Sequence, residues 1–205
     1  MDASNLFATF TVWSWNLQGI YFLSTLYLHL NNQPSSIIIQ TTAILFEVCF
    51  AVAMLVTIVV TFILIPVGMK RGQNVQGMFK PQSLIMHNLN MIFMVMELIW
   101  NQIQIDLTHL PFVILYGLTY VVFAWIYANI RGYFFYFFLN YNQPRAILMH
   151  SVLVFALSLF YVFAYLVTLG FNPEDNPLAF PLLIIGTLLI CRFRVPNIKP
   201  DSAKH

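Results

Sequence analysis

Residues 41–67 read TTAILFEVCFAVAMLVTIVVTFILIPV, an apolar run in which Glu47 is the only charged residue. As an α-helix, a run of this length extends for about 40 Å, because each residue adds about 1.5 Å along the axis. The hydrocarbon core of a membrane is about 30 Å thick and is crossed by about 20 mostly apolar residues. This stretch therefore predicts a membrane-spanning helix.

The composition of the whole chain is that of a protein embedded in lipid. Of its 205 residues, 60% are hydrophobic and only 8% are charged, whereas soluble domains carry about 25% charged residues. The net charge is +2, and no basic run is longer than Lys70-Arg71, which speaks against a nucleic-acid partner. Zinc-type spacings of cysteine or histidine, phosphate-binding loops and dinucleotide motifs are all missing from the sequence, so we expect neither a metal nor a cofactor.

The distribution of basic residues predicts the topology. The apolar runs give six predicted spans, at residues 6–30, 41–67, 83–100, 111–130, 146–169 and 178–191, the last of them short. All nine basic residues then fall on one side: Lys70, Arg71, Lys80, Arg131, Arg145, Arg192, Arg194, Lys199 and Lys204. Positive residues collect on the cytoplasmic side of membranes. We therefore predict an all-α, polytopic transmembrane bundle, a single membrane domain over residues 1–205 with both termini on the cytoplasmic or matrix side.

Polar residues inside these runs form stripes, which lipid would reject. In the first run they are spaced i, i+3, i+7 and i+14 and share one helix face: Thr11, Ser14, Gln18 and Thr25. In the third run an arc of about 120° holds His87, Asn90, Met94, Glu97 and Asn101. We expect the two stripes to face each other or a shared cavity, with Thr11 and His87 at one depth near the basic side.

The residues near the opposite surface form a second predicted polar layer. It contains His29, Glu47, Glu97, Asn101, Asp106 and His109. Glu97 lies about 15 Å along the helix from His87, so it cannot serve that imidazole directly. We expect Glu97 to be a neutral acid or to pair with His29, and Glu47 to be protonated or bonded to a neighbouring helix.

A hydroxyl beside an imidazole is the minimum for nucleophilic catalysis. His87 would accept the Thr11 proton as the oxygen attacks a carbonyl, and would return it to the leaving group. A site at this depth would admit acyl chains, which indicates a lipid ester as substrate. The structural alternatives are a threonine bonded to its own helix and a histidine that only packs. A further alternative is a haem held by His87 and His150, which lie at similar depth on different helices.

The same residues carry a resemblance to a known family. Residues 10–22, FTVWSWNLQGIYF, resemble a segment of the androgen-induced protein family and its rolling-stone-like relatives. The resemblance includes a Thr seven residues before a Gln, matched by Thr11 and Gln18, and a His ten residues before a Glu, matched by His87 and Glu97. A looser block contains Tyr120, Trp125, Gly132, Tyr136, Pro144 and Arg145.

The resemblance covers residues 8–170 and implies an intramembrane threonine hydrolase. Characterised members hydrolyse fatty acid esters of hydroxy fatty acids, so it implies Thr11 as nucleophile and His87 as base. Gln18 and Asn90 would orient groups or donate to the oxyanion, and Glu97 is a further supporting polar residue. The chain departs from the family by lacking the helix before the threonine helix and by adding residues 171–205, a short hydrophobic run and a polar tail.

Two classes of function follow. The first is a lipid ester hydrolase whose partners are membrane lipids. The second is a catalytically silent accessory subunit of a large membrane assembly, such as a mitochondrial respiratory complex, because the chain has short loops and no soluble domain. The endoplasmic reticulum and the mitochondrial inner membrane are both compatible with the sequence.

Overall fold

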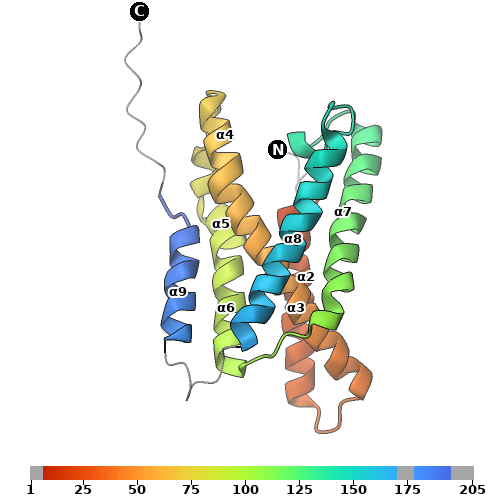
Figure 1. Ribbon diagram of the computed structural model, residues 1–205, viewed down its shortest axis with the longest axis vertical. Helices are drawn as coiled ribbons and strands as arrows, with labels where there is room; N and C mark the ends of the chain where they lie inside the picture. Colours follow the sequence, from red (N-terminus) through yellow and green to blue (C-terminus); the bar gives the residue numbers. More distant parts are fainter. Residues whose placement is uncertain (1–6, 170–177, 195–205) are drawn as a thin grey trace, which may run out of the picture.

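The computed structural model describes residues 7–169 and 178–194, which are helical and contain no β-strand (Figure 1). The α-helices are α2 (Phe10–Leu30), α3 (Ser36–Val59), α4 (Ile65–Lys70), α5 (Pro81–Leu84), α6 (Asn90–Asn101), α7 (Leu110–Arg131), α8 (Ala146–Leu169) and α9 (Ala179–Ile190). Between them lie two π-helical turns, η1 (Val60–Leu64) and η3 (Ile85–Leu89), and three 3₁₀ turns, η2 (Gln76–Phe79), η4 (Leu107–His109) and η5 (Phe137–Leu139). The predicted all-α fold is confirmed. The acidic loop at 172–176 and the tail beyond Arg194 lie outside the described residues.

Four continuous helical stretches are long and apolar enough to cross a membrane. They are Ser36–Lys70, Pro81–Asn101, Leu107–Arg131 and Ala146–Leu169. The 21 residues of α2 would extend about 32 Å, but its polar stripe makes it less apolar than these four. The 12 residues of α9 would extend about 18 Å. The described chain therefore has the helices of an integral membrane protein.

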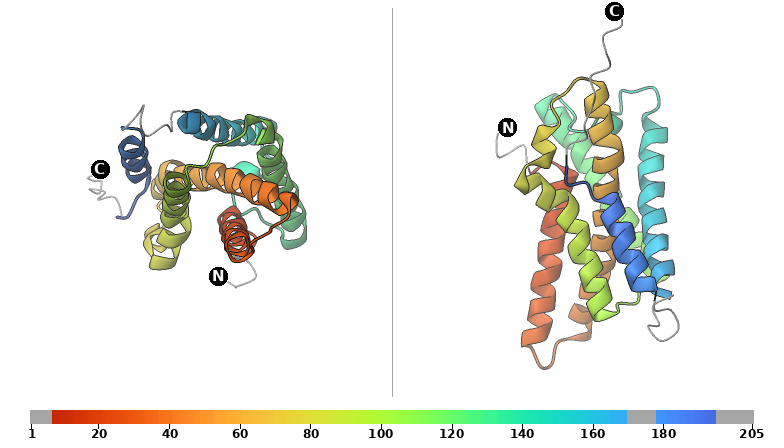
Figure 2. Two further views of the ribbon diagram at one scale, coloured as in Figure 1. Left: turned by 90° about the horizontal axis from the view of Figure 1, so that it is seen from below. Right: turned by 90° about the vertical axis from the view of Figure 1, so that its left-hand side faces the viewer.

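The helix α3 occupies the centre of the bundle. It packs against α2, α6, α7 and α8, which surround it when the bundle is viewed from one end (Figure 2). Residues 46–53 are all buried, so every face of this stretch meets protein. A helix that is apolar all round is expected in such a position. This explains why the apolar run of α3 carries no amphipathic pattern.

The stretch that begins with α3 does not end at residue 67, the predicted end of the second apolar run. The helix continues through η1 and α4 to Lys70. Proline lacks an N–H, and its ring collides with the carbonyl four residues earlier in an α-helix. In η1 the bonds reach one residue further, as shown by the Ile65 N–H that donates to the Val60 carbonyl. This wider turn directly before Pro66 lets the helix pass the proline.

The helix α9 is attached to the bundle through the η3 turn. It packs on α6, as the views in Figures 1 and 2 both show. At its end the Asn88 side chain donates to the Arg192 carbonyl (2.8 Å) and accepts from the Arg192 N–H (3.4 Å). The short predicted run is therefore a packed helix.

Basic residues mark one end of the bundle. The end of α4, the start of α5, the end of α7 and the start of α8 lie toward the upper end in Figure 1. These helix ends carry Lys70, Lys80, Arg131 and Arg145. The charge pattern in the sequence thus corresponds to one end of the folded bundle, which we call the basic end.

Candidate functional site

The polar stripes of α2 and α6 meet in the structure, as predicted. Gln18 Nε2 donates to the Asn90 carbonyl at 2.8 Å, and Asn90 Nδ2 donates to Ser14 Oγ at 3.1 Å. All three side chains are buried. Because buried amides need partners, these bonds fix how the two helices face each other. They also occupy one amide N–H each of Gln18 and Asn90, the residues predicted to stabilise an oxyanion.

Glu97 pairs with different residues from the one expected. Its Oε2 accepts from the Tyr21 hydroxyl at 2.9 Å and from Asn101 Nδ2 at 2.8 Å. His29 is exposed and makes no hydrogen bond with Glu97. The suggested Glu97–His29 pair is therefore wrong, because a buried phenol on the facing helix α2 already satisfies the carboxylate.

Thr11 lies in the first turn of α2 and is 6% exposed. Its hydroxyl is hydrogen-bonded with the Tyr136 hydroxyl, which also accepts from the backbone at Phe10 and Thr11. These donors lower the pKa of Tyr136, but burial of the hydroxyl outweighs them and raises the pKa above its ordinary value of 10.0. Tyr136 is therefore a neutral phenol at physiological pH. In the sequence, Tyr136 stands out only as a member of the looser family-like block, which does not indicate that it would meet Thr11.

His87 lies on η3, where its surroundings differ from those predicted. The Thr57 hydroxyl donates to the His87 carbonyl at 2.6 Å. The Nδ1 atom of the His87 ring is buried and has no hydrogen-bond partner in the described part of the chain. Among the described residues no hydrogen bond joins His87 to Thr11, whose partner is Tyr136. The two predicted catalytic residues are therefore not brought together as a hydrogen-bonded pair.

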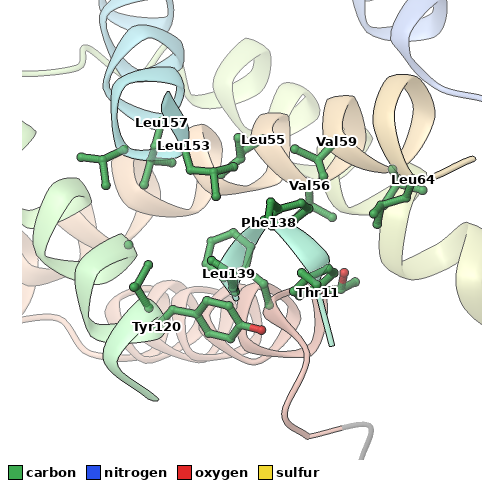
Figure 3. Close-up of a pocket in the computed structure, with 16 residues that line it drawn as sticks. Thr11, Leu55, Val56, Val59, Leu64, Tyr120, Phe138, Leu139, Leu153 and Leu157 are labelled. Atoms are coloured by element: carbon green, nitrogen blue, oxygen red, sulfur yellow. The ribbon is translucent and has the colours of Figure 1, made fainter. Parts of the chain in front are cut away.

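Thr11 borders an apolar cavity between α2, α3, α7, α8 and the segment around η5 (Figure 3). The cavity offers about 60 Å³ to the centres of water-sized molecules, and its walls are almost entirely hydrocarbon. Among the side chains labelled in Figure 3, oxygen atoms come from Thr11 and Tyr120. The Tyr120 hydroxyl donates to the Ala8 carbonyl at 3.0 Å. A narrow apolar space of this kind suits a hydrocarbon chain. We call it the acyl cavity.

Gly117 lets α7 approach α8 at the wall of this cavity. A Cβ atom on Gly117 would lie 2.9 Å from Leu157 Cδ2. Real Cβ atoms essentially never come so close, so a larger residue would have to displace Leu157. Both residues line the acyl cavity, whose width therefore depends on this glycine.

A second, wider pocket adjoins the acyl cavity at the basic end, and we call it the vestibule. It offers about 660 Å³, and polar and apolar atoms contribute about equally to its walls. Leu64 and Tyr136 line both spaces. Among the described residues that line the vestibule, Arg71 is the only charged one, and its guanidinium lies 5.0 Å from the centre of the Phe137 ring. Tyr136 thus lies between a narrow apolar space and a wider space of mixed polarity.

A separate polar cluster surrounds Glu47, which is 2% exposed. Its Oε2 meets the Tyr161 hydroxyl at 2.7 Å and His109 Nδ1 at 3.0 Å, and its Oε1 accepts from the Asp106 N–H at 3.1 Å. The prediction that Glu47 bonds to a neighbouring helix is confirmed. The sequence placed Glu47, Asp106 and His109 in one layer but gave no signal for Tyr161, which looks like an ordinary aromatic residue of α8.

Asp106, in the loop before α7, adds a local interaction to this cluster. Its carboxylate accepts from the Thr108 hydroxyl at 2.7 Å and from the Thr108 N–H at 2.8 Å. These two donors lower the pKa of Asp106 below its ordinary value of 3.8. The cluster therefore ties the 102–109 connection to α3 and α8.

Comparison with family models, with curated proteins and with solved structures finds no match to this chain. The resemblance to the androgen-induced protein family therefore stays a prediction. The haem alternative gains no support from the geometry, because neither His87 nor His150 lines the acyl cavity or the vestibule. The His150 ring lies instead 5.4 Å from the Trp125 ring.

Proposed function

We propose that this protein is a hydrolase-like integral membrane protein that binds a lipid ester across the acyl cavity and the vestibule. The observation that carries the proposal is the position of the Thr11 hydroxyl. It lines the apolar space and is hydrogen-bonded with Tyr136, which lines both spaces. An ester bound with its acyl chain in the cavity and its alcohol in the vestibule has its carbonyl near these two hydroxyls.

The chemistry follows from the two hydroxyl groups. Thr11 Oγ forms a bond to the ester carbonyl carbon, and its proton passes to a base. The neutral Tyr136 phenol donates a hydrogen bond to the developing oxyanion. The C–O bond to the alcohol then breaks, and the alcohol takes the proton and leaves through the vestibule. Water cleaves the acyl-threonine ester in a second step, which releases the fatty acid and restores Thr11.

His87 is the base in this proposal, and the structure sets a condition on it. Its Nδ1 has no hydrogen-bond partner among the described residues, but His87 does not line the acyl cavity. Proton transfer from Thr11 therefore needs a bridging water molecule or a shift of η3. A π-helical turn frequently marks a functional site in a helix, and η3 is such a turn.

The test is hydrolysis of a long-chain nitrophenyl ester by the purified full chain in lipid nanodiscs. Thr11→Val keeps the side-chain volume and removes the hydroxyl, so we expect turnover to fall at least about 100-fold. Thr25→Val is the matched control, because Thr25 lies on the same helix and its hydroxyl, among the described residues, bonds to the Tyr21 and Phe22 carbonyls of that helix. Wild-type turnover in Thr11→Val would refute the assignment of the nucleophile.

The topology proposal adds α2 and α9 to the four long apolar stretches, which gives six spans with both termini on the basic side. It is supported by the location of Lys70, Lys80, Arg131 and Arg145 at one end of the bundle. We place this end in the cytoplasm or the mitochondrial matrix. Cysteines are introduced at positions 3 and 203. An impermeant thiol reagent is expected to label both of them only in preparations in which it can reach the basic side of the membrane. Labelling of the two positions from opposite sides would contradict six spans.

The second candidate is a catalytically silent accessory subunit of a larger membrane assembly, such as a mitochondrial respiratory complex. The specific observation that favours it is the bond between Thr11 and Tyr136, which satisfies the nucleophile without a base. The prediction is that mild detergent extracts the chain in a stoichiometric complex. Extraction as a stable, active monomer would count against this candidate.

A further inference from the structure

We propose that the vestibule binds the head of an anionic glycerophospholipid, so that an acyl ester of this lipid reaches Thr11. The inference rests on the proposed function, because it names the class of lipid that would occupy the same site. It is carried by the charge, the polar groups and the position of the vestibule.

The described lining of the vestibule carries a positive charge and no acidic side chain. Arg71 is the only charged side chain of its lining, and Arg71 makes no ion pair with a carboxylate in the described ranges. The guanidinium stacks 5.0 Å from the Phe137 ring, which restricts its orientation. An oriented guanidinium offers paired N–H donors that match the oxygens of a phosphate.

The remaining polar groups suit a head with hydroxyl groups. Gln73, Asn142 and Gln143 line the vestibule, and their side-chain amides have no hydrogen-bond partner within 7–169 and 178–194. Each amide can both donate and accept, as a glycerol or sugar hydroxyl requires. The vestibule, at about 660 Å³, is also far larger than a lone carboxylate needs.

The position of the vestibule constrains where the ester lies relative to the charge. Tyr136 lines the vestibule and is bonded to Thr11, so the polar head and the reacting carbonyl would be close neighbours. In a glycerophospholipid only the short glycerol backbone separates the acyl ester from the phosphate. In a fatty acid ester of a hydroxy fatty acid, by contrast, the carboxylate lies at the end of a second long chain, so the charge is far from the ester group. The adjoining spaces therefore favour the glycerophospholipid.

The experiment measures lipid retention by the purified full chain. Delipidated protein in mild detergent is incubated with equal amounts of phosphatidylglycerol, phosphatidylcholine and oleate, and retained lipid is quantified by mass spectrometry. We expect phosphatidylglycerol to exceed the other two by about fivefold or more. Arg71→Gln should abolish this preference and Arg71→Lys should retain part of it. Arg145→Gln, which removes the same charge at the basic end but outside the vestibule, should keep it whole.

The outcomes separate this inference from the proposed hydrolysis. Preference for oleate, equal retention of the two phospholipids, or an unchanged preference in Arg71→Gln would each overturn the headgroup assignment. Retention is also measured in Thr11→Val, where we expect the preference to persist because binding does not need the nucleophile. Arg71-dependent retention without any ester turnover would refute hydrolysis and leave the phospholipid site in place.

Discussion

Replacing Tyr161 by phenylalanine should lower the free energy of unfolding by about 2 kcal/mol. Tyr161 is fully buried in α8, and its hydroxyl lies 2.7 Å from Glu47 Oε2 and 2.5 Å from the Asp106 carbonyl. The phenylalanine ring fills the same space, so the substitution removes hydrogen bonding without opening a cavity. It therefore isolates the contribution of one hydroxyl to the cluster around Glu47.

The magnitude follows from what the substitution leaves behind. A hydrogen bond to a charged group contributes about 1.5–3 kcal/mol. Tyr161 has one hydroxyl hydrogen, so its two acceptors cannot both receive a full bond. Glu47 keeps His109 at 3.0 Å and the Asp106 N–H at 3.1 Å, which prevents the larger penalty of a carboxylate without partners. The expected loss is therefore one strong bond.

The assay is unfolding of the purified protein in mixed detergent micelles by titration with dodecyl sulfate, followed by circular dichroism. Tyr165→Phe is the matched control. It lies one turn further along α8, and its hydroxyl makes no hydrogen bond to any described residue. We expect the control to change the free energy of unfolding by less than about 0.5 kcal/mol. If Tyr161→Phe matched the control, the Glu47 cluster would not contribute to stability as reasoned.

Three further predictions concern the cavity, a π turn and a loop. Gly117→Val should displace Leu157 into the acyl cavity and reduce retention of every long-chain lipid in the mass-spectrometric assay, whereas Gly19→Val, where a Cβ has open space, should not. Thr57→Val should cost about 1–2 kcal/mol in the dodecyl sulfate titration, because the buried hydroxyl satisfies a carbonyl of η3; no change would mean that water replaces it. Because the pKa of Asp106 is lowered on folding, its contribution to stability is present above its unfolded pKa of 3.8 and is lost as the pH falls through the folded pKa. The unfolding midpoint should therefore fall more steeply below about pH 4 in the wild type than in Asp106→Asn.

The sequence was sufficient for the helices because apolar length and chain breakers are local signals. The fifth predicted run, 146–169, has the bounds of α8, and the fourth, 111–130, differs from α7 by one residue at each end. The helix that begins with α3 extends three residues beyond the predicted end at residue 67, to Lys70, and this difference has a physical origin. A proline normally ends a helix, and the wider hydrogen bonding that lets the helix continue is not visible in residue types.

The sequence predicted which helix faces meet at the candidate site, but it did not predict which side chain bonds to Thr11. The stripe of Ser14 and Gln18 does meet Asn90, because lipid excludes both polar faces. The partner of Thr11 is Tyr136, which lies more than 100 residues away in a connection between two predicted spans. Pairing of this kind depends on how a connection folds back over a helix end, and helical periodicity carries no information about it.

The π turn η1 makes the site sensitive to chain length as well as to side-chain identity. A π turn holds one more residue than the α-helical turn that it replaces. Deleting one residue from Val60–Leu64 would convert the π turn into a regular α-helical turn, so α4 and Arg71 would keep nearly the same facing relative to α3. The Pro66 ring would then return against the backbone of the preceding turn, which a regular α-helix does not accommodate. Insertions and deletions within η1, more than substitutions, would therefore decide whether the helix continues past the proline and carries Arg71 to the vestibule.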